Sequence, residues 1–131
     1  MESRLTFEHF LLIAEAVVRV PYDELESAVC VFRAQSALAA PFARIQGTYL
    51  YPDPIDQAAI CALRLIRSRP LPFGNKRVGY ECMREMLLLR GFVWSRPAEG
   101  AEEVAGTLKG VEAGAIGEAE FLAWVRSRTG R

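Results

Sequence analysis

Two helical segments that are apolar on more than one face, separated by a short break, constrain the fold of this chain most. Residues 55–67 carry apolar side chains around much of the helix circumference, a pattern typical of a helix buried on several sides. After the break RPLPFG, residues 75–90 again place apolar side chains at helical spacing, and Gly91 is the residue type that commonly ends a helix. We therefore expect two central, buried helices.

Helical periodicity continues through the rest of the chain. It predicts four further helices, over residues 7–19, 23–39, 102–112 and 118–128. Thr6 can cap the first of them, and Pro21 and Pro41 limit the first and the second. Residues 42–54 hold a glycine, two tyrosines and two prolines, which favours a loop or a short hairpin. The sequence predicts a single all-α domain, residues 1–131, of about six helices around one core.

Composition and charge exclude several classes of protein. Of the 131 residues, 51% are apolar and 24% are charged, a balance typical of a folded domain rather than a disordered chain. Sixteen basic and sixteen acidic residues give a net charge of zero, whereas a general nucleic-acid binder needs surplus cations. No apolar run reaches the roughly 20 residues of a membrane span, and the start MESRLTFEHF lacks a signal peptide's charged and apolar regions. We expect a soluble, cytoplasmic protein with no nucleic-acid or membrane partner.

The cysteines and the histidine offer little metal or nucleophile chemistry. Cys30, Cys61 and Cys82 form no CxxC pair and lie among apolar residues, so we expect buried, reduced thiols rather than reactive or zinc-bound ones. His9 is the single histidine, which excludes a metal site built from several histidines of this chain. It lies early in the first helix beside Phe10, away from other titratable motifs, and we expect a structural or surface role for it.

The break between the two central helices carries the clearest chemical signal. A glycine and an asparagine at the start of the second helix leave backbone N–H groups unpaired, and the helix dipole adds positive charge, so the position favours phosphate or carboxylate. Lys76 and Arg77 in the first turn have the wrong charge for helix stability, which indicates an anion between them. Arg64, Arg67 and Arg69 can add to the positive electrostatic potential at this position. The alternative is a polar helix start with solvated side chains.

From Arg69 to Arg77 the chain reads R-P-L-P-F-G-N-K-R, which resembles the signature H-P-F-x-D/E-G-N-K/G-R of the Fic/Doc (Fido) family. The likeness continues in LESAV near residue 25, in LYPDPIDQAA before the first central helix and in MLLLRG at the end of the second. These segments, and the length of the chain, are similar to the Doc (death-on-curing) branch. The resemblance covers essentially the whole chain and implies a Fido fold in which the motif loop joins two buried helices.

The same resemblance implies a function for the loop. Family members hold nucleotide phosphates there and transfer part of the nucleotide, or in Doc a phosphate, to a hydroxyl of a target protein. The matching positions Gly74, Asn75, Lys76 and Arg77 are therefore expected to bind the phosphates of ATP or another nucleotide. The Doc target is elongation factor Tu, and a small antitoxin restrains the toxin through a tail that docks in a groove. The resemblance thus implies a toxin–antitoxin setting with an antitoxin-like protein or peptide as partner.

Three positions depart from the family pattern. Arg69 replaces the histidine that takes the proton of the attacking hydroxyl, and a guanidinium has no acceptor with which to do so. Phe73 replaces the acid that holds Mg²⁺, so no metal is expected at the usual site. Leu71 replaces the phenylalanine that anchors the loop, a conservative change. We expect a phosphate-binding protein that is inactive or altered as a transferase, in which Arg69 can add a fork of donors to a phosphate.

The alternative is an active Doc-like toxin that transfers phosphate or a nucleotide from ATP to a target such as elongation factor Tu. It needs a substitute base and metal ligand. Asp53 and Asp56 lie before the first central helix, and Glu81 and Glu85 are four residues apart on one face of the second. The more ordinary interpretation is that these carboxylates are solvated and pair with Arg77 or Arg84. A helical domain with neither role is a third interpretation, which the whole-chain resemblance disfavours.

Two features of the C-terminal third have weaker interpretations. Residues 95–100, SRPAEG, match the S/T-x-x-x-E-G/N motif of inhibitory helices in some Fic proteins, but Pro97 disfavours a helix across them and we expect a connecting loop. Residues 99–120 hold six acids and a single base, Lys109, which is typical of a solvated helix face and also suits a basic partner.

Overall fold

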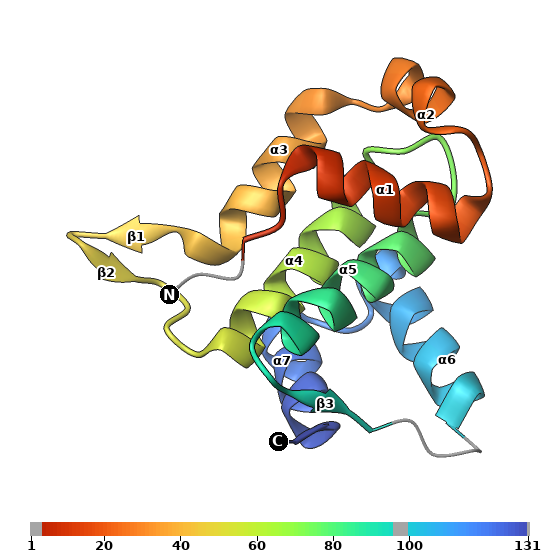
Figure 1. Cartoon of the computed structure of the whole chain (residues 1–131). Helices are drawn as coiled ribbons and strands as arrows, with labels where there is room; N and C mark the ends of the chain where they lie inside the picture. Colours follow the sequence, from red (N-terminus) through yellow and green to blue (C-terminus); the bar gives the residue numbers. More distant parts are fainter. Residues whose placement is uncertain (1–3, 96–99, 131) are drawn as a thin grey trace.

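The computed structural model describes residues 4–95 and 100–130 of the chain. Within these residues the chain forms seven α-helices, one short 3-10 helix and two pairs of two-residue strands (Figure 1). Two long helices, α4 (Pro54–Ser68) and α5 (Asn75–Leu89), lie side by side at the centre and pack more extensively against each other than any other pair of elements does. The predicted all-α architecture and the two central helices are confirmed.

The other helices surround this central pair. α1 (Phe7–Val18) packs on α5, whereas α3 (Val31–Ala39) and α7 (Glu118–Ser127) pack on α4. α6 (Gly100–Ala113) contacts both central helices. The structure therefore has one core, and α4 is at its centre because its apolar side chains cover more than one face.

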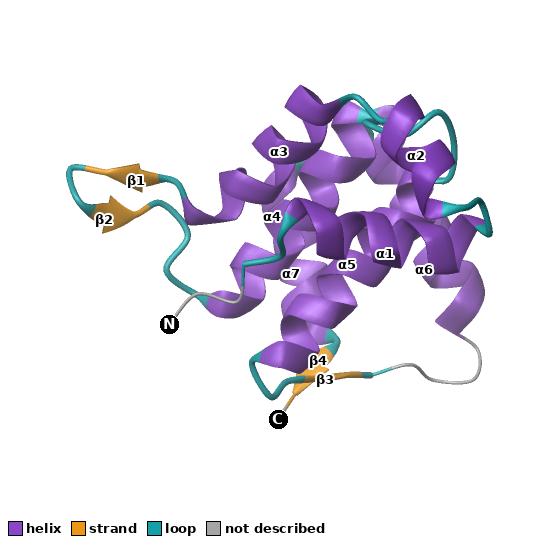
Figure 2. Ribbon diagram, turned by 45° about the horizontal axis from the view of Figure 1, so that its top comes forward, coloured by secondary structure: helices purple, strands orange, loops and turns teal. Residues whose placement is uncertain are grey.

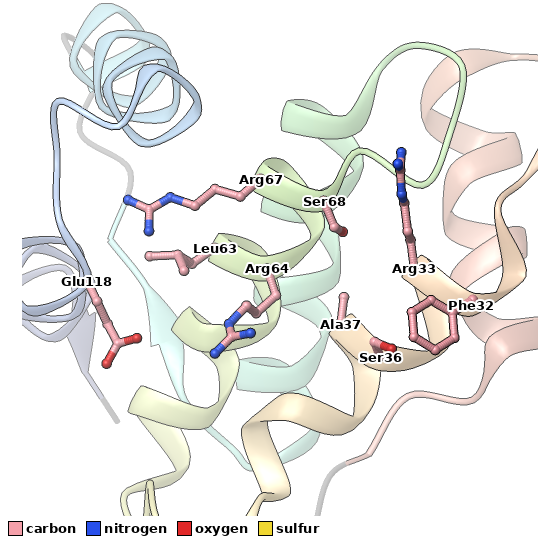
Figure 3. Close-up of a pocket in the computed structure, with 9 residues that line it drawn as sticks. All are labelled: Phe32, Arg33, Ser36, Ala37, Leu63, Arg64, Arg67, Ser68 and Glu118. Atoms are coloured by element: carbon pink, nitrogen blue, oxygen red, sulfur yellow. The ribbon is translucent and has the colours of Figure 1, made fainter.

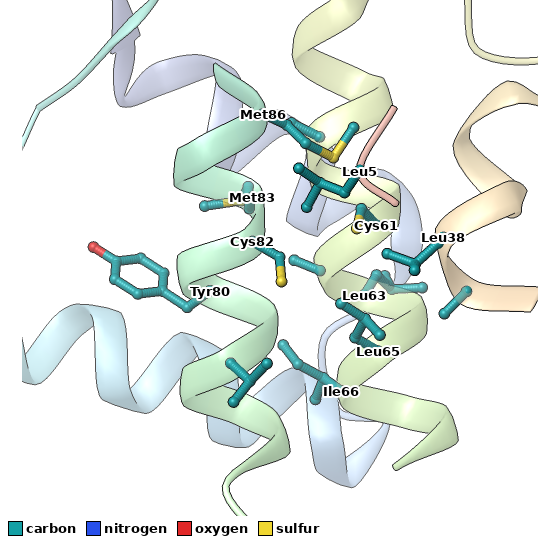
Figure 4. Close-up of a cluster of buried hydrophobic side chains, with 14 of the residues drawn as sticks. Leu5, Leu38, Cys61, Leu63, Leu65, Ile66, Tyr80, Cys82, Met83 and Met86 are labelled. Atoms are coloured by element: carbon teal, nitrogen blue, oxygen red, sulfur yellow. The ribbon is translucent and has the colours of Figure 1, made fainter. Parts of the chain in front are cut away.

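The α4–α5 interface depends on a close approach of the two backbones. Cys82 of α5 and Ile66 of α4 point into the space between the helices (Figure 4), and both are fully buried. A Cβ atom on Gly79 would lie 3.1 Å from Cγ1 of Ile66 and 3.2 Å from the carbonyl oxygen of Ala62. Glycine at this position therefore lets α5 approach α4 more closely than any other residue would.

The ends of the central and first helices follow the local sequence. The Thr6 hydroxyl accepts a hydrogen bond of 3.0 Å from the His9 N–H, which confirms the predicted cap of α1. The Asp53 carboxylate accepts one of 2.8 Å from the Ile55 N–H at the start of α4. Gly91, with a φ of 80°, follows the last turn of α5 as predicted.

The second predicted helix, residues 23–39, is wrong as a single element. The chain forms α2 (Tyr22–Ala28) and α3 instead, because Val29 and Cys30 are extended. The Cys30 N–H donates a hydrogen bond of 2.8 Å to the carbonyl oxygen of Pro70, in the loop between α4 and α5. This long-range bond replaces a helical one, and it explains why residues 4–95 and 100–130 form seven α-helices where about six were expected.

Two small strand pairs complete the fold. β1 (Arg44–Ile45) and β2 (Thr48–Tyr49) follow the 3-10 helix η1 (Ala40–Phe42) and form an antiparallel hairpin, one of the two structures expected there. The turn residues Gln46 and Gly47 have φ values of 52° and 81°, which a tight two-residue hairpin turn requires. This hairpin projects away from the helices (Figure 2).

The second strand pair holds the end of the chain beside the end of α5. β3 (Val93–Trp94) forms an antiparallel pair with β4 (Thr129–Gly130). Among the helices of the described residues, none has both the length and the apolar character needed to cross a membrane.

Candidate functional site

The loop between α4 and α5 is fixed by one buried side chain. The Leu71 N–H donates a hydrogen bond of 3.0 Å to Oδ1 of Asn75, and Nδ2 of Asn75 donates one of 2.9 Å to the Leu71 carbonyl. Leu71 itself is buried, in agreement with the expected apolar anchor. The Asn75 side chain thus holds the loop, and its backbone N–H is the group that it can offer to a ligand.

Gly74 sets the start of α5. Its φ is 78°, and a Cβ atom at this position would lie 2.4 Å from Cγ1 of Val18 at the end of α1. A side chain here would strain the backbone and clash with α1. Because no side chain of the described residues caps α5, the N–H groups of its first turn are left to carry the positive end of the helix dipole.

A hollow of about 410 Å³ opens at this helix start. Arg77, Phe73 and Gly74 line it together with the last residues of α1, including Arg19. Arg19 has a φ of 58° in the left-handed conformation that ends α1, and it lines the same hollow as Arg77. No local pattern indicates this role for Arg19, which the periodicity places only at the end of the first helix.

Lys76 is placed differently from Arg77. Its ammonium group lies 3.1 Å from Oε1 of Glu112 on α6, and both side chains are about one-third exposed. Lys76 does not line the hollow, whereas Arg77 does. The structure therefore does not place the two cations on either side of one anion, as the sequence indicated, because α6 brings a carboxylate to Lys76.

Two of the three positions that depart from the expected motif, Arg69 and Phe73, are exposed. Arg69 is the left-handed residue that ends α4, with a φ of 50°. Phe73 is 53% exposed at the rim of the hollow and has no oxygen that could bind a cation. The described residues contain no group of three or more acids, cysteines or histidines placed to hold a metal ion. Phe73 stands where the expected Mg²⁺ site needs an acidic ligand, so the residues present do not fit the metal.

The four carboxylates considered as substitute bases are all engaged elsewhere. Asp53 caps α4, and the buried Asp56 receives two hydrogen bonds of 2.8 and 2.5 Å from Arg126. Glu81 accepts hydrogen bonds of 3.0 and 3.1 Å from Arg84, which confirms the expected pairing with that arginine. The remaining acid, Glu85, contacts a residue of α1.

That residue is His9, whose Nε2 lies 3.0 Å from Oε2 of Glu85. The expectation that His9 lies away from other titratable groups is wrong, because the packing of α1 on α5 brings together two residues 76 positions apart. Its role in linking two helices agrees with the expected structural role.

Arg64 and Arg67 do not line the hollow at the start of α5. Both line a separate cavity between α3 and α4. Arg67 donates hydrogen bonds of 3.2 and 2.8 Å to the carbonyl oxygens of Val111 and Ile116, at the end of α6 and just after it. Sequence spacing alone could not show this separation, because it depends on which face of α4 meets α6.

The three thiols differ in exposure. Cys61 and Cys82 are buried as expected, and burial raises the pKa of the Cys61 thiol to about 12 and that of Cys82 well above its ordinary value. Cys30 is exposed, so the expectation of burial is wrong for this residue. It lies at the extended break between α2 and α3, where its apolar sequence neighbours do not enclose it.

The acidic C-terminal segment is partly paired within the molecule. Glu103 pairs with Arg128 and accepts a hydrogen bond of 3.2 Å from the Trp124 ring N–H. Glu118 accepts one of 3.1 Å from the Tyr51 hydroxyl. The predicted connecting loop and inhibitory motif at 95–100 fall largely on residues 96–99, outside the described residues.

A groove continues from the hollow along α5. It has a volume of about 570 Å³ and lies between α1, α5 and α6. Val17 and Arg77 line both the hollow and this groove, while Tyr80, Val104 and Leu108 give it an apolar wall. The hollow and the groove together form one continuous surface beside the start of α5.

Comparison with known proteins gives one match. A family model described as the Fic/DOC family matches residues 4–87, well over half of the chain. The matched segment runs from just before α1 almost to the end of α5, and it includes the whole α4–α5 loop. No curated protein and no solved structure matches the chain.

Proposed function

This chain belongs to the Fic/DOC family, and from that premise we propose that it is a Doc-like, toxin–antitoxin-type protein of the cytoplasm. In this proposal the start of α5 binds the phosphates of ATP or another nucleotide. The family's usual transfer reaction is absent or altered. The proposal thus separates binding, for which the residues are present, from chemistry, for which they are not.

The observation that carries the binding part is the hollow at Gly74. Two arginines, Arg19 and Arg77, line it beside the uncapped first turn of α5. Backbone N–H groups and arginine forks are the donors that bind phosphate oxygens most strongly. Lys76 can contribute only by exchanging Glu112 for the ligand.

The missing catalytic groups support the second part. Arg69 cannot accept the proton of an attacking hydroxyl, and loss of a general base costs on the order of 10²–10⁴ in rate. Phe73 cannot bind Mg²⁺, which removes charge stabilisation of several kcal/mol from the transition state. The nearby carboxylates are held by Arg84 and His9 and are not placed as replacements.

An antitoxin-like protein or peptide is the partner that we propose for the groove between α1, α5 and α6. Tyr80, Val104 and Leu108 offer an apolar wall to an amphipathic helix or an extended tail. Glu81 and Arg77 at the groove offer charged contacts.

The second candidate function is an active Doc-like toxin that modifies a hydroxyl of a target such as elongation factor Tu. One observation favours it, namely that Glu81 lines the same groove as Arg77. If a ligand draws Arg84 away, this carboxylate is the one that we assign as the substitute base.

One experiment distinguishes these functions. The purified protein is incubated with Mg²⁺, a bacterial lysate and ATP labelled at the α or the γ phosphate, and ATP binding is measured by calorimetry. We expect ATP binding that Arg77→Ala weakens at least tenfold, and no transfer of label. Label from the γ position on a lysate protein, absent with Arg77→Ala, would establish a kinase, and label from the α position a nucleotidyl transferase. Failure of the wild-type protein to bind a nucleotide would refute the binding site.

A gain-of-function variant tests whether the missing residues alone account for the absence of transfer. Replacing Arg69→His together with Phe73→Asp restores the two family residues in a loop that is already anchored by Leu71 and Asn75. We expect this double variant to transfer label where the wild type does not. Arg69→His alone, without the acid, serves as the matched control and should remain inactive.

A further inference from the structure

One peptide unit in the loop before α5 is held on both of its sides. Its carbonyl, that of Pro70, accepts a hydrogen bond of 2.8 Å from the Cys30 N–H. Its N–H, that of Leu71, donates one of 3.0 Å to Oδ1 of Asn75. Because a peptide unit is planar, fixing both groups fixes the orientation of the plane. We call Cys30, this peptide unit and Asn75 the loop clamp.

The loop clamp is the buried part of a loop that is otherwise open to solvent. Pro70, Leu71 and Asn75 are buried, whereas Pro72 and Phe73 between them are exposed. Asn75 is also the first residue of α5, where the hollow opens. The position of the first turn of α5 relative to the loop therefore depends on the clamp.

Cys30 connects this loop to α3. It lies in the extended junction that precedes α3, and its own carbonyl accepts a hydrogen bond of 3.0 Å from the Ala34 N–H in the first turn of that helix. Figure 3 shows the loop beyond Ser68, beside the start of α3 where Phe32 and Arg33 lie. Cys30 is thus part of the frame of α3 through its carbonyl, while its N–H holds the loop.

We propose that Cys30 is a positioning residue for the phosphate site at the start of α5, an inference that rests on the function proposed above. The Cys30 N–H orients the peptide unit of Pro70 and Leu71, and this unit orients the Asn75 side chain. Hydrogen bonds that share one peptide unit polarise and strengthen each other. The thiol is exposed and takes no part, so the role belongs to the backbone N–H.

Proline is the substitution that isolates this role. Cys30 has a φ of −79°, close to the value that proline imposes, and Val29 is extended, as a residue before proline must be. Cys30→Pro therefore removes the donor in a backbone conformation that proline accepts, and its ring carbon displaces the Pro70 carbonyl. Cys30→Ala removes the thiol, keeps the N–H and is the matched control.

The test combines calorimetric titration of the full-length protein with ATP and amide exchange measured by NMR. We expect Cys30→Pro to weaken ATP binding about fivefold and Cys30→Ala to leave it unchanged. The Leu71 amide should exchange about fivefold faster in Cys30→Pro than in Cys30→Ala. Leu122→Ala truncates a buried side chain of α7 and lowers stability as well. It should leave the ATP affinity of the folded protein unchanged, which separates positioning from a general loss of stability.

A reciprocal measurement needs no variant. Because coupling between two sites acts in both directions, ATP at the start of α5 should strengthen the bond from the Cys30 N–H to the Pro70 carbonyl. ATP should therefore slow exchange of the Cys30 amide in the wild-type protein. The Leu50 amide, which donates 2.9 Å to the Ala43 carbonyl beside the β1–β2 hairpin, should keep its rate.

The outcomes separate this inference from the function on which it rests. Wild-type ATP affinity in folded Cys30→Pro, or exchange of the Cys30 amide that ATP does not slow, would overturn the positioning role and leave the nucleotide site standing. A wild-type protein that binds no ATP would refute the nucleotide site. In that case faster Leu71 exchange in Cys30→Pro would still support the clamp, and an unchanged rate would overturn it.

Discussion

The side-chain amide of Asn75 hydrogen-bonds both backbone polar groups of Leu71, at 3.0 and 2.9 Å. Through this relationship the first residue of α5 fixes the shape of the loop that precedes it. Because the amide is only 6% exposed, it is part of the core rather than of the binding surface. The glycine and asparagine of the motif therefore position the phosphate site, and Arg77 and the backbone N–H groups supply its contacts.

Asn75→Ala should lower the free energy of unfolding by about 2–4 kcal/mol, because it leaves two buried backbone groups of Leu71 unpaired. Chemical denaturation measures the loss. Asn75→Asp keeps the acceptor and loses the donor, so it should fall between wild type and Asn75→Ala at neutral pH. Wild-type stability in the alanine variant would show that the loop does not need these bonds.

Gly74→Ala should destabilise the protein by two separable effects, the positive φ of 78° and the clash with Val18. The φ contributes about 1–2 kcal/mol. Val18→Ala removes the methyl group that the new Cβ meets. The double variant should therefore regain the stability lost to the clash, but not the stability lost to the positive φ. A thermal-denaturation cycle over the four proteins measures this coupling. Strictly additive effects would contradict the contact.

Gly79→Ala and Gly106→Ala should change stability in opposite directions, although both replace a helical glycine. Alanine favours a helix by up to about 1 kcal/mol over glycine. At Gly106 a Cβ atom meets nothing within 4 Å, so the gain is realised. At Gly79 it meets Ile66 and the Ala62 carbonyl, and overpacking costs about 1–3 kcal/mol. Urea denaturation of both variants checks the sign, and stabilisation by Gly79→Ala would refute the close α4–α5 approach.

One of the three thiols should react in the folded protein, and the other two only after denaturation. A thiol reagent should label Cys30 in the folded protein and Cys61 and Cys82 only after denaturation, because the latter two are buried. The pKa of Cys61 is raised from an ordinary value near 9 to about 12 in the folded state. The unfolded thiol therefore loses its proton between these pH values while the folded one keeps it, so this residue lowers stability as the pH rises through that window. Rapid labelling of all three cysteines in the native protein would contradict this burial.

Arg19→Gln and Arg77→Gln should each weaken nucleotide binding about tenfold, because both arginines line the hollow at Gly74 and each substitution removes a charged donor. Lys76→Gln should have a smaller effect, since its ammonium group already pairs with Glu112. Calorimetric titration with ATP ranks the three variants. A larger loss with Lys76→Gln than with Arg77→Gln would mean that Lys76 leaves Glu112 when the ligand binds.

Much of the fold was predictable because it depends on short-range signals. The caps at Thr6 and Gly91 and the apolar faces of α4 and α5 are local patterns, and each led to a correct element. The break in the second predicted helix was not predictable in this way. It depends on the bond from the Cys30 N–H to the Pro70 carbonyl, between residues 40 positions apart in the chain.

Local patterns in the chain specify the helical class, the central pair of helices and a loop whose composition favours an anion. Tertiary packing decided which charges are available there. It brought Glu112 to Lys76, Arg19 to the hollow beside Arg77, and Arg67 to the carbonyls at the end of α6. Periodicity follows from bonds within one helix, whereas the partner of a charged side chain depends on how separate helices pack, which no local pattern in the chain specifies.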